Sequence, residues 1–184
     1  VMNTKVKELM RIPKRFAIEA VMIAIYGQLL VPGRPVEYLI PYSSVLELYD
    51  FKRDQEPIMP DPIEETYVRE KIDAMLRFFD EPLNRKKLDK ILSVPWRKAS
   101  LLVNENVVLK IIYALDQAQF GEAFDPIETE LILAGIHEDV PILTDQIDFI
   151  DKVIDAEIPV QLFDIEDFEF ALEDWDGLSG EVNE

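Results

Sequence analysis

The chain has 184 residues, the size of a single domain, and its lack of cysteine excludes disulfides, thiolate zinc sites and cysteine nucleophiles. Its net charge is −18 and is unevenly spread: residues 121–184 hold 20 acids and one base, Lys152, whereas residues 1–120 hold 17 acids and 18 bases. A field of that sign repels nucleic acid and attracts cations or a basic partner.

The first third of the chain is predicted to alternate strands with helices. The apolar residues and the Gly and Pro breakers indicate a short helix, a buried strand that turns into a helix, a second strand and a further helix, over residues 2–12, 15–27, 36–40 and 43–51. Ser43 or Ser44 is placed to cap the last of these helices. Glu19 interrupts the apolar run of the first strand.

Three helices are predicted in the middle third. The first begins at Pro62 with Asp61 as its N-cap, and the other two cover residues 82–92 and 105–119. The inward stripe of the first helix is predicted as Val68, Ile72, Met75 and Phe79, with outward pairs Glu65–Arg69 and Asp73–Arg77. The second helix makes residues 85–98 the main basic segment of the chain.

The last third gives the clearest pattern. Asp125 and Pro126 open a helix with Glu128 in its first turn, which suits the helix dipole. A strand, a helix, a second strand and a closing helix are then predicted over residues 140–143, 145–156, 158–163 and 164–173. In the helix over 145–156, the predicted core-facing residues are Ile147, Ile150 and Ile154, and the predicted solvent-facing residues are Asp148, Asp151 and Asp155.

A strand, a helix and a strand at this spacing form a βαβ unit, so the predicted fold class is α/β with a parallel sheet. Residues 1–173 are expected to form one domain, and residues 174–184 an acidic, flexible tail. The apolar runs are too short to span a membrane and the N-terminal residues lack a signal-peptide core, so a cytoplasmic protein is expected.

Carboxylates recur at the predicted strand ends and on the adjoining helices. The candidates are Glu19, Glu47, Glu128 and Asp145. Parallel sheets place their ligands outside the carboxyl ends of the strands. Four carboxylates in one cleft repel each other unless a cation lies among them, and hard oxygen ligands favour Mg²⁺ or Mn²⁺. The sequence therefore predicts a divalent metal site, which would activate water for phosphodiester cleavage.

The order of these motifs resembles that of the PIN-domain family of metal-dependent ribonucleases, over about residues 16–172. The segments "FAIEA", with Glu19, and "LIPYSSVLEL", with Glu47, correspond to the first two acidic motifs. Glu128 lies sixteen residues before Thr144, as the third family acid does, and "EIPVQLFDIEDF" echoes the closing strand and helix.

This resemblance implies a three-layer α/β/α fold with a mostly parallel sheet, and metal-dependent RNA cleavage. The chain departs from the family at three positions. Glutamates replace aspartates at 19 and 128, and the expected aspartate of the "T-x-D" turn is Gln146. Asp145 stands one place earlier. The alternative is a PIN-like module without catalysis, whose acidic C-terminal region binds a basic partner or masks segment 85–98 of its own or another copy.

Several of these residues also have plainer interpretations. Asp145 suits a helix N-cap, Glu128 a helix-start acid, and Glu47 a solvent-exposed helix face. Glu19, inside an apolar run, requires either a buried ion pair or a bound cation. Trp96 lies among the bases of segment 85–98, where it could stack on an RNA base, although a solvated helix face explains the same bases. The single histidine, His137, is expected near a helix C-terminus, and self-association is left open.

Overall fold

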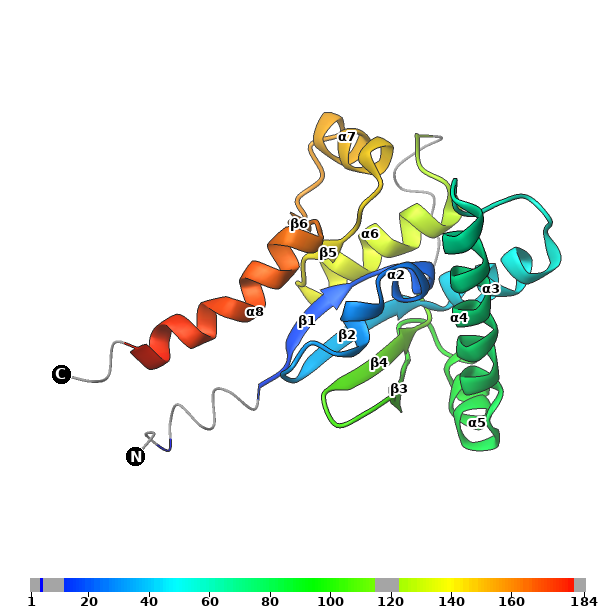
Figure 1. The fold of residues 1–184 in the computed structure, drawn as a ribbon, viewed down its shortest axis with the longest axis horizontal. Coiled ribbons are helices and arrows are strands. Elements are labelled where there is room, and N and C mark those ends of the chain that lie inside the picture. Colours follow the sequence, from blue (N-terminus) through cyan, green and yellow to red (C-terminus); the bar gives the residue numbers. More distant parts are fainter. Residues whose placement is uncertain (1–3, 5–11, 115–122, 181–184) are drawn as a thin grey trace.

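A central sheet of six strands organises the chain (Figure 1). The computed structural model describes residues 4, 12–114 and 123–180, without the side chains of 174–180; the helix predicted over 2–12 lies almost wholly outside these residues. The strands are β1 (Lys14–Ala17), β2 (Val36–Pro41), β3 (Lys98–Leu102), β4 (Val107–Ile112), β5 (Ile142–Leu143) and β6 (Leu162–Phe163), in the order β3-β4-β2-β1-β5-β6. All neighbouring strands are parallel except β3 and β4.

Two apolar cores lie on opposite faces of this sheet. The helical elements are α2 (Ala20–Ile25), η1 (Gly27–Leu30), α3 (Tyr42–Arg53), α4 (Pro62–Asp80), α5 (Pro82–Ile91), α6 (Pro126–Glu138), α7 (Ile147–Asp155) and α8 (Ile165–Gly180). Phe16, Tyr38 and Leu109 pack with α2, α4 and α8 in the larger core, whereas Ala17 and Leu39 pack with α6 and α7 in the smaller one. The predicted α/β class and three-layer α/β/α architecture are therefore confirmed.

The predicted start and inward stripe of α4 are confirmed. Asp61 caps α4 by accepting from the backbone N–H groups of Ile63 and Glu64. Its predicted inward stripe, Val68, Ile72, Met75 and Phe79, is buried. Arg69 pairs with Glu65 as expected, but Asp73 pairs with Lys52 instead of Arg77.

The predicted helix over 105–119 is wrong, because residues 107–112 form strand β4 and pair with the unpredicted strand β3. The buried side chains of Val107, Leu109 and Ile111 alternate with less buried ones, as on a strand, and β-branched residues favour that conformation. Asn104 closes the β3–β4 hairpin by accepting from the N–H groups of residues 106 and 107. Residues 115–119 lie outside the described part.

The predicted orientation of α7 is also wrong. Phe149 and Val153 are its buried residues, whereas Ile147 and Ile154 are 72% and 63% exposed. The apolar half of α7 is wider than the area that α6 and β5 cover, so one edge of it faces solvent. The predicted outward position of the α7 aspartates is confirmed. The closing helix α8 extends to Gly180, beyond the predicted 164–173, and whether residues 174–184 form a separate tail stays a prediction.

An ion network joins the strands to the end of α6. Glu37 on β2 accepts from Arg15 at 2.5 Å and pairs with Lys110 at 2.8 Å. Glu138 on α6 pairs with the same Arg15 and with Lys98. Burial alone would raise the pKa of Glu37, but Lys110 and Arg15 together hold it below its usual range. The network therefore stabilises the fold at neutral pH.

Candidate functional site

Glu19 lies just after β1, at the point where the order of the strands in the sheet changes direction. It lies two residues after the end of β1 and occupies the N-cap position of α2, with only 7% of its surface exposed. From β1 the chain goes to β2 on one side, and later returns to β5 on the other side. Ligands of open parallel sheets bind at such a switch point, outside the carboxyl ends of the strands. The candidate site is therefore centred on Glu19.

A buried hydrogen bond fixes the turn that carries Glu19. The backbone N–H of Ala20 donates to Ser44 Oγ at 2.7 Å, and Ser44 is fully buried. The prediction of Ser43 or Ser44 as a side-chain cap of α3 is wrong, because α3 begins after Pro41 without any such bond. The bond to Ala20 instead connects the switch point to α3, the helix that carries Glu47.

Replacing Ser44 with Ala should lower the free energy of unfolding by about 1–3 kcal/mol, because the buried N–H of Ala20 loses its acceptor. Urea unfolding followed by circular dichroism measures this change. Ser93→Ala is the matched control, since Ser93 is exposed and its hydroxyl bonds only within its own turn. Equal stability of the two variants would show that the bond does not hold the turn.

The predicted acids share one electrostatic environment. Burial and the negative charges of Glu47, Asp125, Glu128 and Asp145 raise the pKa of Glu19 to about 7. Burial and the charges of Asp125 and Asp50 raise the pKa of Glu47 to about 7. The charges of the other predicted acids therefore all act on Glu19. The sequence prediction treated Asp125, a further member of this environment, only as a helix cap.

Lys152 is the site residue that the sequence prediction did not single out. Its Nζ lies 2.9 and 2.7 Å from the two carboxylate oxygens of Glu128, a residue with 8% of its surface exposed. One of these oxygens also accepts from the backbone N–H of Asp125, which completes a capping box at the start of α6. The sequence could have indicated this role, because Lys152 is the only base in residues 121–184 and so the only positive side chain there to pair with an acid.

Gln146 and Asp145 occupy the remaining side of the site. The Gln146 amide nitrogen lies 3.5 Å from a Glu19 carboxylate oxygen. Gln146 stands where the resemblance to PIN domains led us to expect an aspartate. Asp145 is exposed and accepts a hydrogen bond from the Tyr26 hydroxyl. Burial and this bond raise the pKa of Tyr26 to about 12. The interpretation of Asp145 as an N-cap is wrong, because Gln146 holds that position in α7.

In this conformation, the acids of the site are not arranged as a divalent metal centre. Among the residues that the structure describes, no three His, Asp or Glu side chains are placed to hold a metal ion. The oxygens of Glu128 are bonded to Lys152, and Gln146 is neutral where the resemblance to PIN domains led us to expect an acid. Mg²⁺ requires near-octahedral oxygen coordination. Metal binding by Glu19, Glu47, Glu128 and Asp145 stays a prediction.

Segment 85–98 is partly engaged within the protein. Arg85 bonds to Asp80 and Tyr49, and Lys98 pairs with Glu138. The Trp96 ring stacks on His137 with ring centroids 4.1 Å apart and planes 9° apart. One face of Trp96 is thus covered by protein, and RNA binding by this segment stays a prediction.

Comparisons with known proteins assign no family to the chain. No model of a known protein family matches the chain, and no curated protein is significantly similar to it. In the described ranges, no helix has the length and apolar composition needed to cross a bilayer. The resemblance to PIN domains therefore rests on the sequence motifs quoted above.

Proposed function

We propose that the chain is a PIN-like interaction module that does not depend on a metal and does not hydrolyse RNA. The observation that carries this proposal is the Lys152 ammonium, which contacts both oxygens of Glu128 in the carboxylate cluster. In a metal-dependent hydrolase, a cation is needed among such acids. Here a side chain of the protein supplies the positive charge.

Two further features relieve the same repulsion without a metal. Gln146 places an amide, and not a carboxylate, beside Glu19. The raised pKa values of Glu19 and Glu47, both about 7, leave these two groups partly protonated at neutral pH. The cluster is thus compensated by a lysine, an amide and protons. A site of this kind keeps the fold of a metal enzyme but needs no metal for its own stability.

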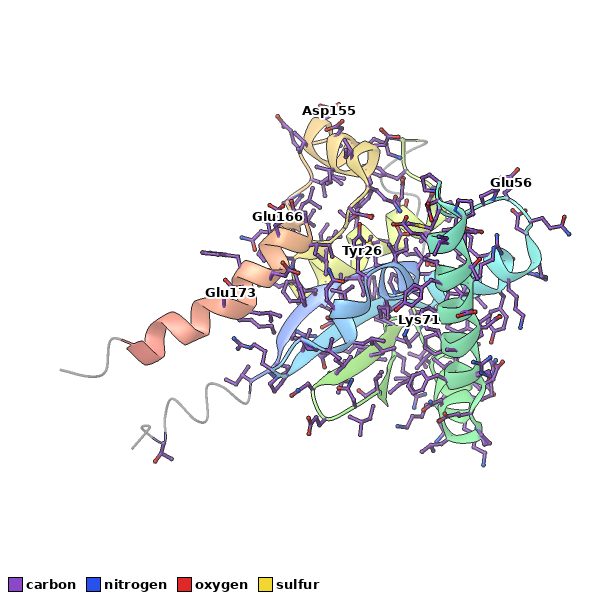
Figure 2. All side chains as sticks on the ribbon, in the orientation of Figure 1. Tyr26, Glu56, Lys71, Asp155, Glu166 and Glu173 are labelled. Carbon is purple, nitrogen blue, oxygen red and sulfur yellow. The ribbon has the colours of Figure 1, made fainter. Side chains whose placement is uncertain are left out.

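The surface available for interaction lies on α7 and α8. Figure 2 shows Asp155 on α7 and Glu166 and Glu173 along α8, and all three are exposed. Exposed apolar side chains lie among the acids, with Phe170 65% exposed on α8. A mixed acidic and apolar surface suits a basic protein partner. The negative field of the surface would accelerate the association of such a partner.

A second candidate function, a Mg²⁺- or Mn²⁺-dependent ribonuclease, is favoured by the position of Glu19 at the switch point of the sheet. Glu19, Glu47, Glu128 and Asp145 would then hold the metal, and the metal would activate water. In that case Lys152 would have to leave Glu128 when the metal enters.

Thermal melting and RNA cleavage distinguish the two functions. A ligand that binds only the folded state raises the melting temperature by mass action. We expect millimolar Mg²⁺ or Mn²⁺ to shift the wild type and Glu47→Gln equally, and single-stranded RNA to stay intact. Glu56→Gln, in an exposed loop outside the site, is the control. A shift and metal-dependent cleavage that are both lost only in Glu47→Gln would replace the proposal with the ribonuclease.

A further inference from the structure

The outward edge of α7 combines apolar and acidic side chains. Ile147 and Ile154 are 72% and 63% exposed, although both are large β-branched residues. Asp148, Asp151 and Asp155 are exposed on the same helix, and none of these acids forms a salt bridge with another described residue. We call this surface, residues 145–157, the α7 face. It holds five acids and the single base Lys152.

The opposite end of the molecule carries a surface of complementary composition. On α5 and the loop that follows it, Leu83, Leu92 and Val94 are 65%, 39% and 48% exposed. Lys86 and Lys90 are exposed among them, and neither forms a salt bridge with a described residue. We call this surface, residues 81–98, the α5 face. It holds six bases and two acids.

The two faces lie too far apart to meet within one chain. In Figure 1, α7 is at the top of the view and α5 at the lower right, with the sheet and α6 between them. An α5 face can therefore contact only the α7 face of another molecule. Apolar centres surrounded by opposite charges are the composition expected of two surfaces that bind each other.

We propose that copies of this chain associate head to tail, with the α7 face of one copy on the α5 face of the next. Leu83, Leu92 and Val94 would pack on Ile147 and Ile154, while Lys86 and Lys90 approach the α7 aspartates. A contact between two different faces is heterologous, so it builds rings or open chains and not a closed two-fold dimer. This inference rests on the proposed function, because it names the partner of the interaction module.

Sedimentation velocity over a range of concentrations tests the association. The wild type is expected to gain mass above the monomer as its concentration rises. Lys86→Glu with Lys90→Glu should raise the dissociation constant about tenfold or more, because the new glutamates then repel the α7 aspartates of the next copy. Arg53→Glu with Arg77→Glu makes the same change of charge at exposed positions outside both faces, and should associate like the wild type.

A mixing experiment separates a broken interface from a misfolded variant. Asp151→Lys with Asp155→Lys reverses two of the charges that Lys86 and Lys90 approach and brings the net charge of the α7 face to zero, so this variant alone should also associate more weakly than the wild type. Mixed with the Lys86→Glu, Lys90→Glu variant, it should associate again, because the new lysines at 151 and 155 then approach the new glutamates at 86 and 90 and restore pairs of opposite charge. A wild type that stays monomeric, or a mixture that does not associate, overturns the proposal and leaves a basic protein of another sequence as the partner to seek. Neither outcome alters the metal and RNA readouts that decide the proposed function.

Discussion

Glu19→Gln is expected to stabilise the protein by about 1–3 kcal/mol at pH 8. The physical reason is the pKa of Glu19, which burial and the neighbouring acids raise from an ordinary value of 4.5 to about 7. A carboxyl group whose pKa is raised on folding is ionised at a free-energy cost in the native state, and that cost is about 3 kcal/mol at most for this difference. Glutamine keeps the shape and cannot ionise.

The sign of this effect depends on pH in a defined way. Between pH 4.5 and about 7, the folded state binds more protons at Glu19 than the unfolded state does, so wild-type stability falls as the pH rises. Below pH 4.5 both states are protonated there, and Glu19→Gln should match the wild type. Above pH 7 the gain of the variant should be complete. Chemical unfolding at pH 4.5, 6 and 8 measures this profile.

Glu37→Gln is the matched control, because its change should have the opposite sign. Lys110 and Arg15 hold the pKa of Glu37 below its usual range, so its ionised form stabilises the fold. That stability is present above the unfolded pKa and is lost as the pH falls through the folded one. Glu37→Gln should therefore destabilise the protein at pH 8. If Glu19→Gln destabilised it as well, Glu19 would have to be held by a cation, contrary to the proposed function.

Lys152→Met is expected to lower the free energy of unfolding by about 1–3 kcal/mol at pH 7. The substitution keeps most of the apolar stem but leaves the buried Glu128 carboxylate without its ammonium partner, among other acids. Breaking a buried pair on one side can cost 3–5 kcal/mol. The expected value is smaller because the Lys152 side chain is 36% exposed and the charge is partly screened by water.

A double-mutant cycle identifies the pair as the source of this loss. Lys152→Met combined with Glu128→Gln removes both charges and should recover most of the stability lost in Lys152→Met alone. Arg77→Met is the control, since Arg77 is an exposed base on α4, outside the site and outside both faces. Strictly additive changes at residues 152 and 128 would show that the two side chains do not stabilise each other. Added Mn²⁺ should stabilise Lys152→Met more than the wild type, because the variant has lost its internal cation.

The parts of the fold that the sequence predicted correctly are those with strong local signals. Asp125 and Pro126 open α6 as predicted, and Asp125 and Glu128 form a capping box there, because the two residues are only three positions apart. The wrong prediction over residues 105–119 concerns "VVLKII", a short apolar run whose periodicity suits either a helix or a strand. Its conformation is decided by pairing with β2 and β3, which are distant in sequence.

The sequence indicated the acids of the candidate site but not the groups that compensate their charge. Strand ends and helix starts indicated Glu19, Glu47 and Glu128, since parallel strands bring their carboxyl ends to one edge. The contact between Lys152 and Glu128 depends on how α7 rotates on the smaller core. The α7 pattern alone allowed two rotations, and the predicted one would have placed Ile147 inside. The observed rotation exposes Ile147 and Ile154 and turns Lys152 towards Glu128.

The length of β6 has a consequence for aggregation. An unpaired strand at the edge of a sheet is a template for further strands, and long apolar edges promote fibril growth. Here the sheet ends in a strand of only two residues, Leu162 and Phe163, and α8 begins two residues after it and packs beside it. An incoming chain finds almost no backbone to extend on this side. The protein can therefore expose apolar helix surface for assembly while its sheet resists templated growth at β6.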